Sequence, residues 1–212
     1  MPYRAKTTIG NGVDSGNDPF FNNVVSLLHF DGTTYVDQIS GNSWAASGNA
    51  ALSSSAAKFG AKSLAVPATA RSMISCTNTS FTMGTKADFT IEAFVYLNST
   101  TGYHVLHSSA DSSTFEFAIV DGVLQVYVSG AWNSLGGTTI TSGSWYHIAV
   151  SRHGGMVFGF VNGTLCPNRV VYTGQVCSSN AISIGAQPGG AQFLCLDGYI
   201  DDYRFTKGIA RY

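Results

Sequence analysis

The sequence predicts an all-β fold in which two antiparallel sheets pack against each other, preceded by an N-terminal arm. Apolar and polar residues alternate with a period of two in several segments, and Gly, Ser and Asn interrupt these segments roughly every ten to fifteen residues. No stretch has the apolar spacing of a convincing amphipathic helix. Strands with one apolar face bury that face by packing two sheets together, so we expect a sandwich.

The alternation is clearest in residues 89–97 (FTIEAFVYL), where Phe89 and every second residue after it are apolar. The residues between them, such as Glu92, lie on the other face of the strand. Further segments behave alike and are predicted strands: residues 114–120, 123–128, 145–150 and 156–161. Asp121-Gly122 and Asn162-Gly163 each follow one of these segments and predict tight hairpin turns.

The chain is predicted to divide at residue 23. Residues 1–23 are polar and include the turn signal DPFF, so we expect an arm that docks onto a partner rather than a packed element. Residues 24–212 are predicted to form one domain, because 212 residues suffice for a single β-sandwich core. The arm lacks the apolar region of a secretory signal, so we expect synthesis in the cytoplasm without signal-peptide export.

The composition excludes several classes of partner. Charged residues make up 11% of the chain, far below the roughly 25% of typical soluble domains, and the net charge is −1. Neither nucleic acid nor anionic lipid is therefore an expected partner. No apolar run approaches the roughly 18 residues that a membrane helix requires. The surface must instead consist largely of Ser, Thr, Asn and Gly.

Four cysteines occur at positions 76, 166, 177 and 195, without the spacing of a zinc site. One interpretation is that all are reduced thiols packed as small apolar groups. The alternative is a disulfide between Cys166 and Cys177, which would close a loop of roughly ten residues and stabilise the fold by about 3 kcal/mol.

The segment GYIDDYRFTKGIARY (198–212) raises a further question, because it places two carboxylates side by side in a predicted strand. Strict alternation puts Asp201 on the same face as Tyr199, Tyr203 and Phe205. Asp202 then shares the opposite face with Arg204 and can form an ion pair with it. If Asp201 faces the core, its carboxylate must be hydrogen-bonded, paired or bound to a metal ion.

Six segments in this order resemble the laminin-G-like, concanavalin A-like jelly-roll domains, particularly those of tailed-bacteriophage virion proteins. The segments are residues 24–44, 58–66, 87–97, 143–164, 182–186 and 198–212. The resemblance implies a jelly-roll sandwich for residues 24–212. It indicates function less specifically, since this fold occurs in lectins, adhesion modules, glycosidases and decoration proteins.

The resemblance also bears on Asp201, because laminin-G-like sandwiches often carry one calcium ion. In that interpretation Asp201 binds calcium together with Asp31, Asp37 and carbonyl oxygens. In the alternative, Asp201 accepts hydrogen bonds from the backbone and hydroxyl groups of HFDGTT, the segment that follows the first strand, and ties the terminal strands together.

The sequence does not predict an enzyme. Glycoside hydrolysis requires two carboxyl groups roughly 5–9.5 Å apart, and the β-glucanase branch of the fold carries an E-x-D-x-x-E run. The chain contains only two glutamates, Glu92 and Glu116, and neither lies in such a run. No GxSxG, HExxH or phosphate-binding glycine loop is present. We expect His147 to be a satisfied core or cross-strand histidine.

Saccharide-binding sandwiches present flat aromatic rings beside amide groups, and Trp132 with Asn133 is the candidate pair. The alternative for Trp132, and more so for Trp44, is that the ring folds back to cap the sandwich. Trp145 belongs to a segment that the resemblance assigns to the core.

Together these observations predict a non-enzymatic structural or adhesion protein on the surface of a bacteriophage virion, either a capsid decoration protein or a module of the tail or a fibre. Its partners would be other virion proteins, contacted through the arm, and host glycans. The resemblance also implies a homo-oligomer, a trimer especially. The alternatives are a carbohydrate-binding lectin module and, less favoured, a glycosidase.

Overall fold

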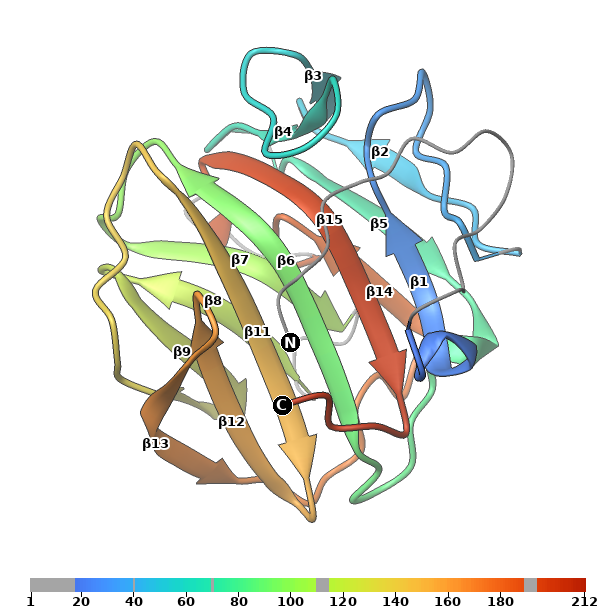
Figure 1. The fold of residues 1–212 in the computed structure, drawn as a ribbon, viewed down its shortest axis with the longest axis vertical. Helices are drawn as coiled ribbons and strands as arrows, with labels where there is room; N and C mark the ends of the chain where they lie inside the picture. Colours follow the sequence, from blue (N-terminus) through green and yellow to red (C-terminus); the bar gives the residue numbers. More distant parts are fainter. Residues whose placement is uncertain (1–17, 40, 70, 110–114, 189–193) are drawn as a thin grey trace.

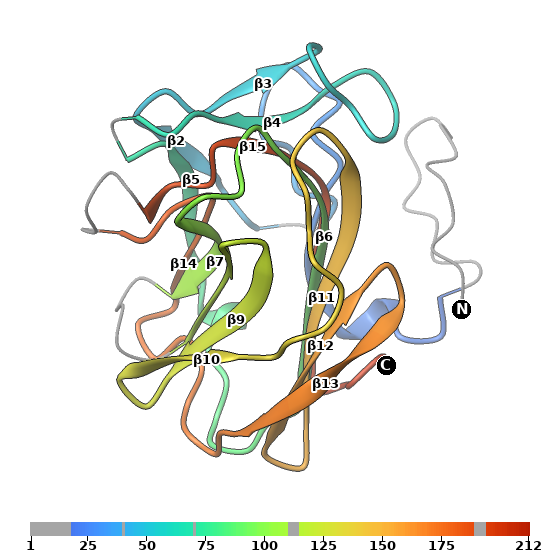
Figure 2. The same cartoon turned by 90° about the vertical axis from the view of Figure 1, so that its left-hand side faces the viewer.

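A computed structural model describes residues 18–212 except residues 40, 70, 110–114 and 189–193. Two antiparallel sheets face each other and enclose the core, as Figure 1 shows from one side and Figure 2 from the edge. The predicted all-β sandwich is therefore confirmed. Most of the predicted arm, residues 1–17, lies outside the described residues.

Sheet A contains eight strands and lies nearer the viewer in Figure 1. Strand β15 is central, and β1 and β4 pair with different parts of one of its edges. The strands in spatial order are β13 (Thr164–Val171), β12 (Met156–Val161), β11 (Trp145–His153), β6 (Phe89–Leu97), β15 (Gly198–Lys207), β4 (Ser63–Val66) and β3 (Ala51–Ser53), with β1 (Val24–Leu28) also on β15.

Sheet B contains seven strands and forms the opposite layer. Its strands in spatial order are β10 (Ala131–Ser134), β9 (Val123–Val128), β8 (Glu116–Val120), β7 (Tyr103–Ser109), β14 (Ala181–Ile184), β5 (Met73–Thr77) and β2 (Ala45–Ser47). The helices of the described chain are two short 3-10 turns, η1 (Phe21–Asn23) and η2 (Thr79–Phe81). Within the described residues, no helix has the length and apolar character needed to cross a membrane.

The core is formed by every second residue of the strands. In β6, the residues from Phe89 to Leu97 at every second position belong to the central apolar cluster, as predicted. The alternate residue Glu92 lies on the outer face of sheet A. In sheet B, Leu124, Val126 and Val128 of β9 enter the same cluster. Each strand therefore presents one face to the core and the other outward.

The predicted hairpin turns are present because their residues accept left-handed backbone conformations. Asp121 and Gly122 have φ of 48° and 79°, and they join β8 to β9. Asn162 and Gly163 have φ of 51° and 79°, and they join β12 to β13. Positive φ at both central residues defines the turn that matches the twist of antiparallel strands.

Strand β15 contains a β-bulge at Asp201 and Asp202, which we call the acidic doublet. Its register with β6 shifts between Asp201 and Arg204, and Asp202 has φ of 49°. The bulge lies where β15 changes neighbour on its other edge. Strand β4 pairs with residues 198–200, and β1 pairs with residues 203–206.

The bulge changes which side of β15 faces the core. Ile200 belongs to the core cluster before the bulge, whereas Tyr203 and Phe205 belong to it afterwards. The ring of Tyr199 instead contacts that of Tyr96 at 5.8 Å between centroids. The prediction that Tyr199 shares a face with Tyr203 and Phe205 is therefore wrong, because the extra residue shifts the alternation by one position.

Each aspartate of the doublet holds one neighbouring segment. The fully buried Asp201 accepts hydrogen bonds of 2.9 Å from the backbone N–H groups of Lys58 and Phe59, just before β4. Asp202 Oδ1 lies 2.5 Å from Nδ1 of His29, just after β1. Asp201 is thus a hydrogen-bonded structural carboxylate. These two donors lie outside the segment HFDGTT that was considered from the sequence, and the contact of Asp202 with His29 adds a partner that the sequence did not indicate.

We predict that Asp201→Asn lowers the free energy of unfolding by about 2–4 kcal/mol, because it weakens charge-assisted hydrogen bonds to buried backbone groups. Chemical denaturation checks this value. The control is Asp121→Asn, whose exposed carboxylate accepts one bond from Gly102 N–H and whose position in a hairpin turn suits asparagine. Equal losses in the two variants would contradict a special role for Asp201.

Candidate functional site

Trp132 lies on the outer face of sheet B and forms an aromatic cluster with two tyrosines. Its cross-strand partner on β9 is Tyr127, and the two ring centroids are 5.4 Å apart. The ring of Tyr103, at the start of β7, lies 5.5 Å from that of Trp132 on another side. Tyr103 is 36% exposed, and the other two rings are half-buried. We call Tyr103, Tyr127 and Trp132 the aromatic platform.

The platform rests on a small apolar cluster that is separate from the main core. Val105, Ala118 and Val120 are buried on the outer face of sheet B, and Trp132 packs against them. This packing fixes the indole ring and leaves part of it accessible. Trp132 is thus neither folded into the main core nor fully exposed.

Asn133 does not form a site with Trp132. Consecutive residues on a strand point to opposite sides, so the two side chains diverge on β10. The Asn133 amide donates to the carbonyl oxygen of Ala131 at 2.8 Å. The structure therefore groups Trp132 with Tyr103 and Tyr127, which the sequence reasoning did not select. Alternation along β9 was the available signal, because it places Tyr127 on the face opposite Val126 and Val128.

Glu116 lies on the same outer face, directly opposite Tyr127 in the pairing of β8 with β9. Its side chain is 1% exposed and accepts a hydrogen bond of 2.9 Å from the Ser108 hydroxyl. Burial raises the pKa of Glu116 to about 7, and hydrogen bonds from Ser108 and Gln187 offset this effect only in part. Glu116 is the single acidic residue within the strands of sheet B, which contain no Lys or Arg.

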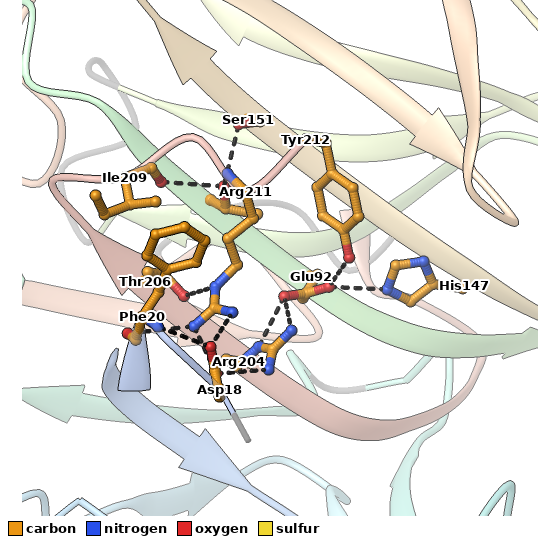
Figure 3. A network of polar contacts seen from close by, with 11 residues as sticks. Asp18, Phe20, Glu92, His147, Ser151, Arg204, Thr206, Ile209, Arg211 and Tyr212 are labelled. Carbon is orange, nitrogen blue, oxygen red and sulfur yellow. Dashed lines mark hydrogen bonds and ion pairs between the residues drawn. The ribbon is translucent and has the colours of Figure 1, made fainter. Parts of the chain in front are cut away.

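The outer face of sheet A is instead covered by an ionic network, drawn in Figure 3. Glu92 on β6 is fully buried; its carboxylate lies 2.7 Å from Arg204 Nε and 3.0 Å from His147 Nε2. The Tyr212 hydroxyl also donates to Glu92. Burial raises the pKa of Glu92, but the bond from His147 and the charge of Arg204 outweigh that effect and lower it to about 2.

The same network joins the beginning of the described chain to its last residues. Arg211 forms a bidentate pair with Asp18, with both nitrogen–oxygen distances at 2.9 Å. Arg204 reaches Asp18 as well, at 3.3 Å, and thereby links it to Glu92. Through these contacts, visible in Figure 3, Arg211 and Tyr212 hold the last residues of the chain against the outer face of sheet A.

The two glutamates lie on opposite layers of the sandwich. Glu92 is on the outer face of sheet A, and Glu116 is on the outer face of sheet B. The core separates them, so they do not form the close carboxyl pair that glycoside hydrolysis requires. His147 is buried opposite Phe94 on β6 and contacts Glu92 of the same strand diagonally, so it is a cross-strand histidine as expected.

The two other tryptophans, Trp44 and Trp145, pack against neighbouring side chains of the sandwich. Trp44 is 9% exposed, and its Nε1–H donates to Asp37 at 3.0 Å, so it caps the sandwich. Trp145 was expected in the core but is half-buried on the outer face of sheet A, where its ring contacts that of Tyr96 at 5.7 Å. The reason is the alternation of β11, in which Ile148 and Val150 are the residues that enter the core.

Of the three aspartates considered as calcium ligands, Asp31 and Asp201 bind the backbone of one segment, residues 58–62, whereas Asp37 has other donors. Asp31 accepts from the backbone N–H groups of Ala61 and Lys62, and Asp201 from those of Lys58 and Phe59. Asp37 accepts hydrogen bonds from Ser26 Oγ, Leu27 N, Ile39 N, Asn42 Nδ2 and Trp44 Nε1. The described part of the chain contains no group of three or more His, Cys, Asp or Glu side chains arranged to hold a metal ion.

The cysteines are buried thiols. Cys166 lies against Gly137 and Gly159, whereas Cys177 Sγ donates to the carbonyl oxygen of Ala181. The cysteines thus agree with the interpretation of reduced, packed thiols and not with the alternative disulfide between Cys166 and Cys177, whose side chains pack in different surroundings. Burial raises the pKa of the Cys166 thiol, which lowers its reactivity.

Two antiparallel sheets packed as a sandwich are the architecture of double-sheet jelly rolls, a class that includes lectin domains. A family model for laminin-G domains, described as the concanavalin A-like lectin/glucanases superfamily, matches residues 69–209. Because this match covers more than half of the chain, the protein belongs to that superfamily. No curated protein is significantly similar in sequence.

Solved structures share the fold at low sequence identity. Domain 4 of AbnA, an extracellular GH43 arabinanase from Geobacillus stearothermophilus in complex with arabinotriose, has a TM-score of 0.64 and 19% identity over 89% of this chain and 94% of that chain. The botulinum neurotoxin serotype G binding domain has a TM-score of 0.66 and 14% identity over 90% of this chain. This chain spans about half of that domain, 49% of its length.

We predict that neither calcium nor EDTA shifts the thermal unfolding midpoint, because backbone and side-chain donors already satisfy Asp31, Asp37 and Asp201. Differential scanning fluorimetry in each condition measures the midpoint. A rise with calcium that EDTA reverses would contradict this prediction.

We also predict that Glu116→Gln gains stability over the unmodified chain as the pH rises from about 4.5 to about 7. The folded state holds the proton of Glu116 up to about pH 7, whereas an unfolded carboxyl releases it near its ordinary pKa of 4.5. Folding therefore becomes less favourable through this window for Glu116 but not for glutamine. Denaturation curves at pH 4, 6 and 8 measure the difference. A difference that does not change with pH would contradict the raised pKa.

Proposed function

We propose that this protein is a carbohydrate-binding module that holds saccharide rings on the aromatic platform of sheet B. The observation that supports this most directly is the packing of Trp132 between Tyr103 and Tyr127. Its ring is held in place from below by an apolar cluster and is partly accessible from outside. Aromatic rings with an apolar body and a polar edge suit the faces and hydroxyl groups of sugars.

The structural neighbours support a saccharide as the ligand class. One of them is a domain solved with arabinotriose, and another belongs to a neurotoxin whose cell entry depends on two ganglioside molecules. These ligands belong to those proteins. Their relevance here is that sandwiches of this shape serve saccharide binding in more than one setting.

We propose that the module is not catalytic. Glu116 is the single acidic residue of the sheet B strands, and its pKa of about 7 leaves it largely neutral in mildly acidic conditions. A hydrolytic mechanism requires a second carboxyl group nearby, and Glu92 lies beyond the core. Turnover of arabinotriose or of a host polysaccharide by the unmodified chain would contradict this part of the proposal.

We further propose that the protein is displayed on a bacteriophage particle, attached to other virion proteins through its arm and assembled as a homo-oligomer. The resemblance of six segments to virion domains and the sparsely charged composition support this placement. The described chain begins at Asp18 on the outer face of sheet A, the side away from Trp132. That arrangement suits attachment on the side of sheet A with the platform directed outward.

We predict that Trp132→Ala lowers the affinity for saccharides at least tenfold, since stacking on one aromatic ring contributes about 0.5–1.5 kcal/mol beyond the area it buries. A glycan array identifies the ligands, and isothermal titration calorimetry measures the dissociation constants.

The matched control is Trp145→Ala, which removes another half-buried tryptophan from the outer face of sheet A. Its affinity is expected to equal that of the unmodified chain. Loss of binding in Trp145→Ala alone would move the site to sheet A. Silence across the array together with retained binding to phage capsids would support capsid decoration in place of glycan recognition.

A further inference from the structure

A pocket of about 310 Å³ lies at one end of the sandwich, next to the aromatic platform. It is formed where the loops before β5, before β7 and before β15 approach one another. Its lining includes Ala68, Ser99, Thr101, Tyr103, His104 and Asp197. Tyr103 belongs to both features, because its ring also contacts that of Trp132. Tyr103 therefore takes part in both the pocket and the platform.

His104 gives this pocket a specific hydrogen-bonding character. Its Nδ1 is hydrogen-bonded to the carbonyl oxygen of Leu196, and a carbonyl oxygen only accepts hydrogen bonds. Nδ1 must therefore carry the hydrogen, and in the neutral ring Nε2 is left with a lone pair. His104 is 3% exposed, and Nε2 has no hydrogen-bond partner in the described structure.

An unpartnered buried acceptor costs stability. The loss for such a group is about 1–3 kcal/mol, so it calls for a reason of its own. A metal ion does not supply that reason, because the described residues offer no set of three ligating side chains here. Neighbouring atoms cover Nε2 in this structure, so a ligand that displaces them and donates a hydrogen bond to Nε2 would supply that reason.

We propose that this pocket is a saccharide subsite in which a ligand hydroxyl donates a hydrogen bond to Nε2 of His104. The inference rests on the proposed carbohydrate-binding function and extends it from the platform to the end of the sandwich. The ligand class is a neutral saccharide. Ser99, Thr101 and Asp197 offer oxygen acceptors, and neither lysine nor arginine lines the pocket to balance an anionic sugar.

Two variants separate the two nitrogens of the ring. In His104→Asn the side-chain amide can still donate to Leu196, but the acceptor at the position of Nε2 is lost. In His104→Gln the longer amide can place an oxygen near that position. We expect His104→Asn to lose about tenfold or more in affinity for a neutral saccharide and His104→Gln to stay within about threefold. The unfolding midpoints of both variants verify that they fold.

The test combines these variants with NMR of the unmodified, ¹⁵N-labelled protein. Correlation spectra of the imidazole nitrogens are expected to show the Nδ1–H tautomer of His104. Titration then uses a panel of neutral oligosaccharides that includes arabinotriose, with sialyllactose as the anionic counterpart. Neutral ligands are expected to move the Nε2 resonance of His104.

The outcomes distinguish the subsite from the platform. An Nε2–H tautomer overturns the inference before any ligand is added. Binding that depends on Trp132 but leaves Nε2 and the affinity of His104→Asn unchanged overturns the subsite and leaves the proposed function intact. Preference for sialyllactose overturns the assignment of a neutral ligand. Failure of every saccharide to bind overturns both the proposed function and the subsite.

Discussion

The hydrogen bonds of two adjacent carboxylates hold the centre of sheet A together. Strand β15 pairs with β6 along one edge, but its other edge is divided between β4 and β1. Asp201 binds the backbone that leads into β4, and Asp202 binds His29 just beyond β1. A strand that changes neighbour midway leaves backbone donors that need partners, and buried carboxylates supply strong ones. The bulge and the acidic doublet are therefore one structural device.

The bulge also determines which side chains of β15 reach the outer face of sheet A. Because the bulge shifts the alternation, Tyr203 and Phe205 enter the core while Arg204 reaches Glu92 on the outer face. The resulting network binds Asp18 and Tyr212 and occupies part of the outer face of sheet A, beside the rings of Trp145 and Tyr96. Among the described residues, no comparable ionic network lies on the outer face of sheet B. Its outer face carries a platform of aromatic rings around a carboxyl group that burial tends to keep protonated.

The sequence predicted those features that follow from the alternation within a single strand. The bounds of β6, β9 and β12 agree with the predicted segments, and both hairpin turns occur where Asp-Gly and Asn-Gly stand. Features that depend on the pairing between strands could not be predicted from the sequence. The bulge in β15 places Tyr199 and Tyr203 on opposite faces, and the backbone donors of Lys58 and Phe59 lie more than a hundred residues from Asp201 along the chain. Trp132 was found, but its ring partners depend on the register of β9 and the position of β7.

The chemistry of the platform implies a site that gains little from charge. The strands of sheet B contain no Lys or Arg and one acidic residue, so binding there relies on ring contacts and a few neutral hydrogen bonds. Such contacts contribute about 0.5–1.5 kcal/mol each, which limits the affinity of one module for one glycan. The proposed display of many copies on one particle would overcome that limit, because each bound module raises the effective concentration of the next. The proposed oligomer and the weakly charged platform therefore support each other as parts of one adhesive surface.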